Sequence, residues 1–373
     1  MNDTSSQSRH YEVLDGLRGI AALSVLLYHL FEAEAFASGA AEQRFFHGFL
    51  AVDFFLVLSG FVVGHAYDRR WDRMSVGDFI RKRFARLHPM VVAGVVIGLV
   101  CFLAQGCERW DGTAVPVWNV LVAVVLALFM IPSPLPLDVR GNTEMFPLNG
   151  PCWSLFFEYV GSLLYAVWIR RLSTRALKCL VLAAAVALLL IGIFGPDGSI
   201  GYGWSSQPLN MLGGFLRMFF DFPMGLLLAR LFREKKRETL GSWVFPVCAV
   251  LMLGLLAVPS LGKMRVGYEL FCVMVAFPAL VWLGALGNAG SLFGRKTMLW
   301  IGECSYPLYM IHYPFIYLYI GWIKDGRNPF GTHSWSTPVT LAILCIVLSA
   351  LLMIVWEHPA RAFLNKKFSR RSS

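Results

Sequence analysis

The chain has 373 residues, of which 57% are hydrophobic and only 15% charged, and its mean hydropathy is +0.60. Soluble domains carry about 25% charged residues, so this composition excludes a soluble protein and predicts a polytopic membrane protein. The net charge of +10 lies mostly in short links between apolar runs, which is typical of cytoplasmic loops and argues against a nucleic-acid partner.

Eleven apolar runs follow one another along the chain: 16–36, 47–67, 88–106, 117–133, 153–170, 176–195, 209–232, 241–260, 266–286, 298–322 and 338–357. Basic blocks separate several of them, at 69–86, 170–178, 230–237, 295–296 and 361–371. The blocks ending at Arg86 and beginning at Arg170 both resemble cytoplasmic loops, so the chain must cross the bilayer an even number of times between them. Only two of the three runs there can therefore cross. We predict an all-α bundle of about ten transmembrane helices, with 117–133 and its Pro-rich continuation as a re-entrant segment.

The chain 1–373 is expected to form a single integral membrane domain. Its core is residues 11–361, and the tails 1–10 and 362–373 are expected in the cytoplasm. The first run ends near small residues, as a cleaved signal peptide would. Acidic residues outweigh the arginines before it, however, so we interpret it as a retained span.

The first span carries two ionisable residues, Arg18 and His29. Ionisable residues inside a membrane cost roughly 2.5–3.5 kcal/mol each on insertion scales and usually mark function. The eleven helical steps from Arg18 to His29 turn about 1100°, which is within about 20° of three full turns, and rise about 16 Å. The two side chains therefore lie on the same face of the helix. His29 could exchange a proton near neutral pH, or it could be a core histidine that bonds a carbonyl group.

The second span contains Asp53 near its outer end and the pair Ser59-Gly60. Asp53 could orient a catalytic imidazole, or it could cap a helix. Ser59-Gly60 permits close approach of a backbone, which small-residue helix packing explains equally well.

A basic segment at 81–89 is expected to be a cytoplasmic turn before the third span. Arg83 and Arg86 are one helical turn apart and could hold the phosphates of a nucleotide-like donor. Ordinary positive-inside charge in contact with lipid headgroups is the alternative interpretation.

Three later spans also carry polar side chains. Trp153 opens a span that places Glu158 at a depth comparable to His29, so Glu158 is a second acid–base or orienting candidate. Arg217 and Asp221, four residues apart, are expected to neutralise each other. A span containing Pro307 and Pro314 carries three residues on one face that could line a cavity or simply pack: Ser305, Tyr309 and His312.

Signals for several other chemistries are missing from the sequence. It has no Walker A loop, no dinucleotide fingerprint and no G-x-S-x-G elbow. The eight cysteines are scattered without C-x-x-C spacing, so we expect neither a disulfide framework nor a metal site.

An ordered set of motifs runs through nearly the whole chain: Leu14-Asp15-Gly16-Leu17-Arg18-Gly19 with His29, Asp53-Phe54-Phe55 with Ser59-Gly60, Arg83-Phe84-Ala85-Arg86, Trp153-Ser154-Leu155 with Glu158, and Ser305-Tyr306-Pro307-Leu308-Tyr309 with His312. In this order the motifs resemble those of the acyltransferase-3 family of bacterial integral membrane acyltransferases. The resemblance implies a ten-helix unit that moves an acyl group, commonly acetyl, from cytoplasmic acyl-CoA. The acceptor is usually a hydroxyl of an envelope or exported carbohydrate.

The same resemblance implies roles for individual residues. His29 matches the catalytic histidine, with Arg18 in line to support donor binding. Arg83 and Arg86 match the family's R-x-x-R turn near the CoA phosphates, and Glu158 matches its WSLxxE carboxylate. The expected site residues fall into three groups: catalytic His29, Glu158 and Asp53; donor-binding Arg18, Arg83, Arg86, Ser59 and Gly60; and cavity-lining Trp153, Ser305, Tyr309 and His312.

We therefore expect a membrane O-acyltransferase of the bacterial inner membrane with no tightly bound cofactor or metal and with acetyl-CoA as donor substrate. Its partners would be the bilayer, a carbohydrate or lipid-linked glycan acceptor, and polysaccharide export or assembly proteins. Some relatives append an extracytoplasmic SGNH domain, and we expect this chain to be the stand-alone type. A proton-coupled transporter that uses His29, Asp53 and Glu158 as relays is the alternative function.

Overall fold

The computed structural model describes residues 11–39, 43, 45–234, 239–290, 294–326 and 336–369, and every regular element in these residues is helical. The helices are α1 (Glu12–Ser38), α2 (Ala51–Tyr67), α3 (Val76–Ala104), α4 (Val117–Leu128), α5 (Cys152–Val167), α6 (Thr174–Phe194), α7 (Pro208–Glu234), α8 (Val244–Ala257), α9 (Arg265–Phe271), α10 (Phe277–Leu286), α11 (Arg295–Lys324), α12 (Ser336–Leu352) and α13 (His358–Ser369). The expected tail 1–10 and the ends of two basic blocks, at 235–237 and 370–371, lie outside the described residues.

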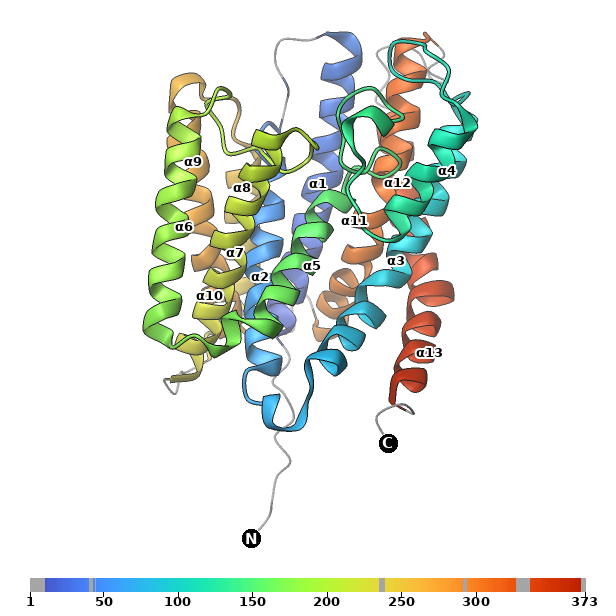
Figure 1. Ribbon diagram of the computed structural model, residues 1–373. Coiled ribbons are helices and arrows are strands. Elements are labelled where there is room, and N and C mark those ends of the chain that lie inside the picture. Colours follow the sequence, from blue (N-terminus) through green and yellow to red (C-terminus); the bar gives the residue numbers. More distant parts are fainter. Residues whose placement is uncertain are drawn as a thin grey trace.

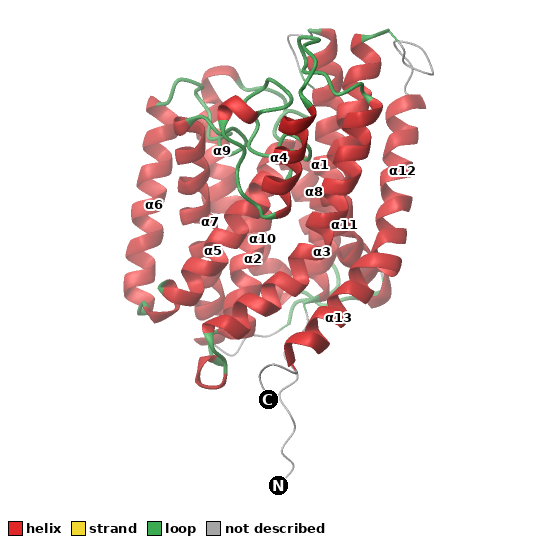
Figure 2. Ribbon diagram, turned by 45° about the vertical axis from the view of Figure 1, so that its right-hand side comes forward, coloured by secondary structure: helices red, strands yellow, loops and turns green. Residues whose placement is uncertain are grey.

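The helices form a bundle whose long members run between the same two ends (Figure 1, Figure 2). Seven described segments are long and apolar enough to cross a membrane: Glu12–Ala37, Gly48–Tyr67, Val76–Ala104, Thr174–Phe194, Pro208–Glu234, Gly262–Leu286 and Ser336–Ser369. Helices α5, α8 and α11 run alongside them. The predicted polytopic all-α bundle is confirmed.

Helix α4 does not cross the bundle. Its 12 residues span only about 18 Å, against a hydrocarbon thickness of about 30 Å. The backbone amide of Trp110, before α4, donates to the carbonyl oxygen of Arg140, after α4, at 3.1 Å. The chain therefore returns to the end from which α4 began, as predicted for a re-entrant segment.

The described parts of the basic blocks gather at one end of the bundle, which we call the basic end. It is the lower end in Figure 1, where α1 begins and α13 ends. The prediction of a turn at 81–89 is wrong, because these residues are helical: α3 already begins at Val76. A reciprocal pair of hydrogen bonds between Ser75 and Asp78 caps the start of this helix, so Arg83 and Arg86 lie on a helical face.

Helices α2 and α7 pack so closely that Gly60 has no room for a side chain. A Cβ atom at Gly60 would lie 2.1 Å from the carbonyl oxygen of Phe222, and one at Gly225 would lie 2.0 Å from that of Val57. Gly60, which was expected to bind the donor, thus permits close contact between two helices, and it lines neither of the two cavities described below.

Candidate functional site

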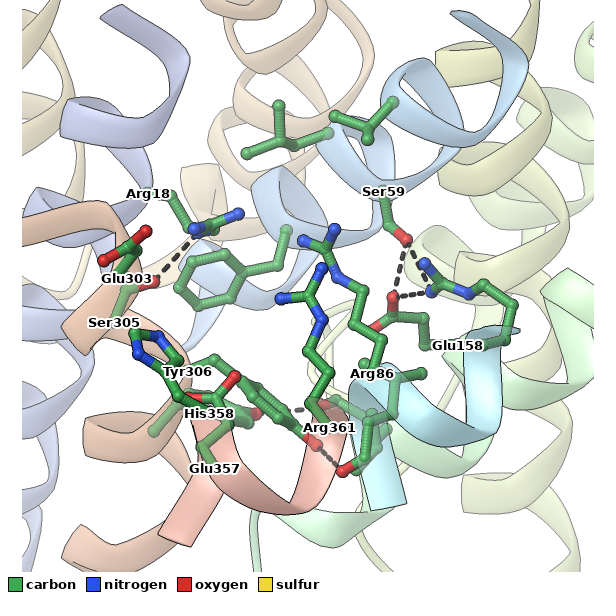
Figure 3. A pocket seen from close by; sticks show the side chains of 18 residues that line it. Arg18, Ser59, Arg86, Glu158, Glu303, Ser305, Tyr306, Glu357, His358 and Arg361 are labelled. Atoms are coloured by element: carbon green, nitrogen blue, oxygen red, sulfur yellow. Dashed lines mark hydrogen bonds and ion pairs between the residues drawn. The ribbon is translucent and has the colours of Figure 1, made fainter. Parts of the chain in front are cut away.

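A cavity of about 150 Å³ opens among α1, α2, α3, α5, α11 and α13, and we call it the basic cavity. Four arginines line it: Arg18, Arg83, Arg86 and Arg361. Three carboxylates line it as well: Glu158, Glu303 and Glu357. Figure 3 shows the charged side chains converging on this space from several helices. The arginines expected near a donor therefore come together, and Arg361 joins them.

Arg18 is held in the basic cavity by the kinked helix α11. Its Nε donates to Ser305 Oγ at 2.9 Å and its Nη2 donates to the carbonyl oxygen of Gly302 at 2.6 Å. Asp15 lies 3.3 Å from the same guanidinium, so this charge already has a partner. Ser305 thus lines the cavity as expected and positions Arg18.

Arg83 is buried and forms an ion pair with Glu158, whose Oε1 also accepts a hydrogen bond from Ser59 Oγ at 2.7 Å. The expectation that Glu158 lies at the depth of His29 is wrong. Helix α5 begins inside the bundle, after the long segment 129–151, so its residues lie nearer the basic end than expected. Glu158 therefore lines the basic cavity. Its partner Ser59 lines the same cavity.

Arg86 and Arg361 differ from the other two arginines, because neither forms an ion pair or hydrogen bond with any residue that the structure describes. Both side chains point into the basic cavity in Figure 3. Unpaired guanidinium groups in a confined space favour an anionic ligand, and arginine binds phosphate oxygens in a bidentate manner.

A second cavity of about 320 Å³ lies farther from the basic end, and we call it the histidine cavity because His29 lines it. His29 Nδ1 lies 2.6 Å from Glu32 Oε2. The Glu32 carboxylate also accepts hydrogen bonds from the hydroxyl groups of Tyr28 at 3.0 Å and Tyr313 at 3.4 Å. A carboxylate at Nδ1 fixes the tautomer in which Nε2 carries the free lone pair, as a general base requires.

Glu32 is a candidate site residue that the sequence motifs did not single out. The available signal was its spacing, since residues three apart on a helix are neighbours on one face.

His312 lines neither cavity, so its expected placement is corrected. It is buried on α11, and its ring centroid lies 5.3 Å from that of His29. Its Nδ1 donates to the carbonyl oxygen of Tyr309 at 2.8 Å, while Nε2 has no hydrogen-bond partner among the described residues. His312 therefore supports the wall behind His29.

Tyr309 lines both cavities and stands between them. Its hydroxyl group and Ser154 Oγ are 2.7 Å apart. Trp153, the remaining residue expected to line a cavity, lines the histidine cavity. A ligand that extended from the basic cavity to His29 would therefore pass Tyr309.

Asp53, which was expected to orient an imidazole, pairs with Arg217, while the imidazole of His29 has Glu32 as its partner. Its two carboxylate oxygens accept hydrogen bonds from Arg217 Nε at 2.8 Å and Nη2 at 2.7 Å. Both residues are buried where α2 and α7 pack together. The expected pairing of Arg217 with Asp221 is also corrected, because Arg217 reaches across to the neighbouring helix. Asp53 therefore has a structural partner and is not a helix cap.

The segment after α4 adds one acidic residue to the histidine cavity. Burial raises the pKa of the Glu144 carboxyl to about 7. A carboxyl group with this pKa is partly protonated near neutral pH, so Glu144 can donate or accept a hydrogen bond there.

Comparison with known proteins places these observations in a family. The model of a family described as "Acyltransferase domain" matches residues 11–356. The chain is 28% identical to the acyltransferase MdmB of Streptomyces mycarofaciens, over 95% of this chain and 92% of that protein. It is 27% identical to the peptidoglycan O-acetyltransferase OatA of Listeria monocytogenes, over 85% of this chain and 51% of that protein.

It is also 26% identical to the putative peptidoglycan O-acetyltransferase YrhL of Bacillus subtilis, over 100% of this chain and 58% of that protein. The chain thus spans little more than half the length of these two relatives. No solved structure matches.

Proposed function

Because the chain belongs to the acyltransferase-3 family, we propose that it transfers an acyl group, acetyl by preference, from acyl-CoA to a carbohydrate hydroxyl. Family membership confirms the predicted class of enzyme, a multi-pass membrane acyltransferase. One observation carries the remainder of the proposal: the His29–Glu32 pair and the unpaired arginines occupy adjoining cavities that share Tyr309.

The donor would bind with its phosphates in the basic cavity. CoA carries several negative charges at its nucleotide end and an uncharged thioester at the end of a flexible arm. Arg86 and Arg361 offer guanidinium groups without protein partners, which suits phosphate oxygens. Arg18 and His29 are separated by a rise of about 16 Å along α1, so the arm would extend past Tyr309 toward His29.

His29 would act as the general base in the transfer step. Its Nε2 removes the proton of the acceptor hydroxyl, and the resulting oxygen attacks the thioester carbonyl carbon. The carbon–sulfur bond then breaks, and the CoA thiolate takes the proton to leave as the free thiol. Transfer through an acyl-histidine intermediate yields the same products, and Glu32 would stabilise the charged imidazolium in either route.

The proposed acceptor is a sugar hydroxyl of a cell-envelope or exported glycan. The relatives named peptidoglycan O-acetyltransferases support this class of acceptor. The histidine cavity supports it too, because aromatic rings of Trp153, Trp204 and Tyr313 line it beside the polar groups of Asn142 and Glu144. Aromatic faces with a few placed polar groups suit a sugar ring.

The proposed location is the bacterial inner membrane, with the basic end in the cytoplasm according to the positive-inside rule. This orientation would place the basic cavity on the side where CoA is made. The histidine cavity would then face glycans handled by export or assembly proteins.

Acetyl-CoA labelled in its acetyl group tests the proposal in membranes that contain the wild type or His29→Ala at equal expression. We expect label in the polysaccharide or lipid-linked fraction and release of free CoA with the wild type, and neither with the variant. Equal labelling by a well-folded His29→Ala protein would contradict the assignment of the base. No label and no free CoA in the wild type would contradict the donor.

A further inference from the structure

Helix α13 contributes an arginine to the basic cavity from outside the residues matched by the family, which end at 356. Arg361 lies on this helix, and Figure 3 shows it beside Arg86 with both side chains directed into the same space. In the sequence Arg361 is only the first residue of the last basic block.

The position of α13 is determined by specific contacts. A π-helical turn at Met353–Glu357 joins α12 to α13, and such turns often occur at functional sites. Trp356 Nε1 in this turn donates to the carbonyl oxygen of Pro89 at 2.7 Å. Because Pro89 belongs to α3, this bond holds the start of α13 against the helix that carries Arg86.

The four cavity arginines fall into two groups, according to whether each guanidinium group has a protein partner. Arg18 interacts with Asp15 and Ser305, and Arg83 interacts with Glu158. Arg86 and Arg361 have no ion pair or hydrogen bond within the described part of the chain. These two guanidinium groups are therefore the ones available to an anionic ligand.

The arginines also differ in depth. Arg83 is 5% exposed, Arg86 is half-buried, and Arg361 is exposed at the edge of the cavity. In a CoA thioester the diphosphate lies between the acyl arm and the ribose, and the 3′-phosphate on that ribose is at the end opposite the thioester. If the thioester extends inward to His29, the 3′-phosphate is the group that remains at the edge.

We propose that Arg361 binds the ribose 3′-phosphate of the CoA donor and thereby makes α13 part of the donor site. The inference rests on the proposed function, because it assumes that CoA occupies the basic cavity. It assigns to one residue the discrimination between CoA and 3′-dephospho-CoA, two ligands that differ only in that phosphate.

Binding of CoA and of 3′-dephospho-CoA to the purified full chain in detergent tests the inference without knowledge of the acceptor. We expect the wild type to bind CoA about tenfold more tightly than 3′-dephospho-CoA, as for one hydrogen-bonded charge pair near solvent. Arg361→Ala should bind both ligands equally, with the affinity of the wild type for 3′-dephospho-CoA. Arg361→Lys should retain part of the preference for CoA.

Lys366→Ala is the matched control, because it removes the same charge from an exposed position of α13 that does not line the cavity. It should bind both ligands like the wild type. If Arg361→Ala keeps the tenfold preference, Arg361 does not bind the 3′-phosphate. If it weakens both ligands equally, Arg361 contacts a group that the two ligands share, and the inference is wrong as well. If the wild type binds neither ligand, the proposed donor fails and the inference fails with it.

Discussion

Replacing Glu32 with Gln should reduce the turnover number for acyl transfer while leaving the affinity for the donor unchanged. The carboxylate lies 2.6 Å from His29 Nδ1 and is far along α1 from the arginines of the basic cavity. A glutamine amide can donate to Nδ1, which would move the imidazole proton to Nε2 and remove the base.

The magnitude follows from the bond that is lost. A hydrogen bond to a charged group contributes about 1.5–3 kcal/mol, which alone corresponds to roughly 10- to 150-fold in rate. The wrong tautomer adds to this, and the comparable substitution in serine proteases reduces turnover by about 10⁴-fold. We therefore expect Glu32→Gln to lower the turnover number by about 10²- to 10⁴-fold.

Initial rates with labelled acetyl-CoA, measured against donor concentration in membranes at matched expression, give both kinetic constants. Glu34→Gln is the control, because Glu34 lies on the same helix, accepts a hydrogen bond from Tyr319 at 3.0 Å and lines neither cavity. A turnover number of Glu32→Gln within about twofold of the wild type would refute a role for the carboxylate in preparing His29.

Two further predictions concern stability and can be checked by thermal unfolding in detergent. Gly60→Ala should cost about 1–3 kcal/mol, because its Cβ would meet the carbonyl oxygen of Phe222. Gly254→Ala should be tolerated, because a Cβ there would meet no side chain and no other helix within 4 Å. Arg217→Met should cost about 3–5 kcal/mol, because it leaves the buried carboxylate of Asp53 without its cation. Equal stability of the two glycine variants would contradict the packing role of Gly60, and an unchanged unfolding temperature for Arg217→Met would contradict the structural ion pair.

Much of the fold follows from patterns within single segments. Apolar runs predicted the crossing segments, and the basic blocks together with the Pro-rich stretch identified α4 as the segment that does not cross. Helical spacing placed Arg18 and His29 on one stripe, and the structure puts them in adjoining cavities. Such inferences succeed because they depend on periodicity and length alone.

Contacts between segments could not be predicted in the same way. Nothing in the local sequence indicates that Asp53 pairs with Arg217 rather than remaining near His29, because that choice depends on how α2 packs against α7. The depth of Glu158 was misjudged because the start of α5 depends on the path of the preceding loop. Glu32 is the exception, since its spacing from His29 was visible.

The two arginines of the R-x-x-R motif illustrate how much a tertiary contact changes an interpretation. By sequence Arg83 and Arg86 are equivalent candidates for a donor phosphate. In the structure Glu158 neutralises Arg83, and a phosphate there would have to compete with a carboxylate that already forms an ion pair with it. Arg86 shares the cavity with Glu158 and Glu357 but forms no ion pair or hydrogen bond with either among the described residues, so the phosphate-binding role that the motif suggests falls to Arg86. Arg83 then serves to hold α3 against α5, which keeps the wall of the basic cavity in place.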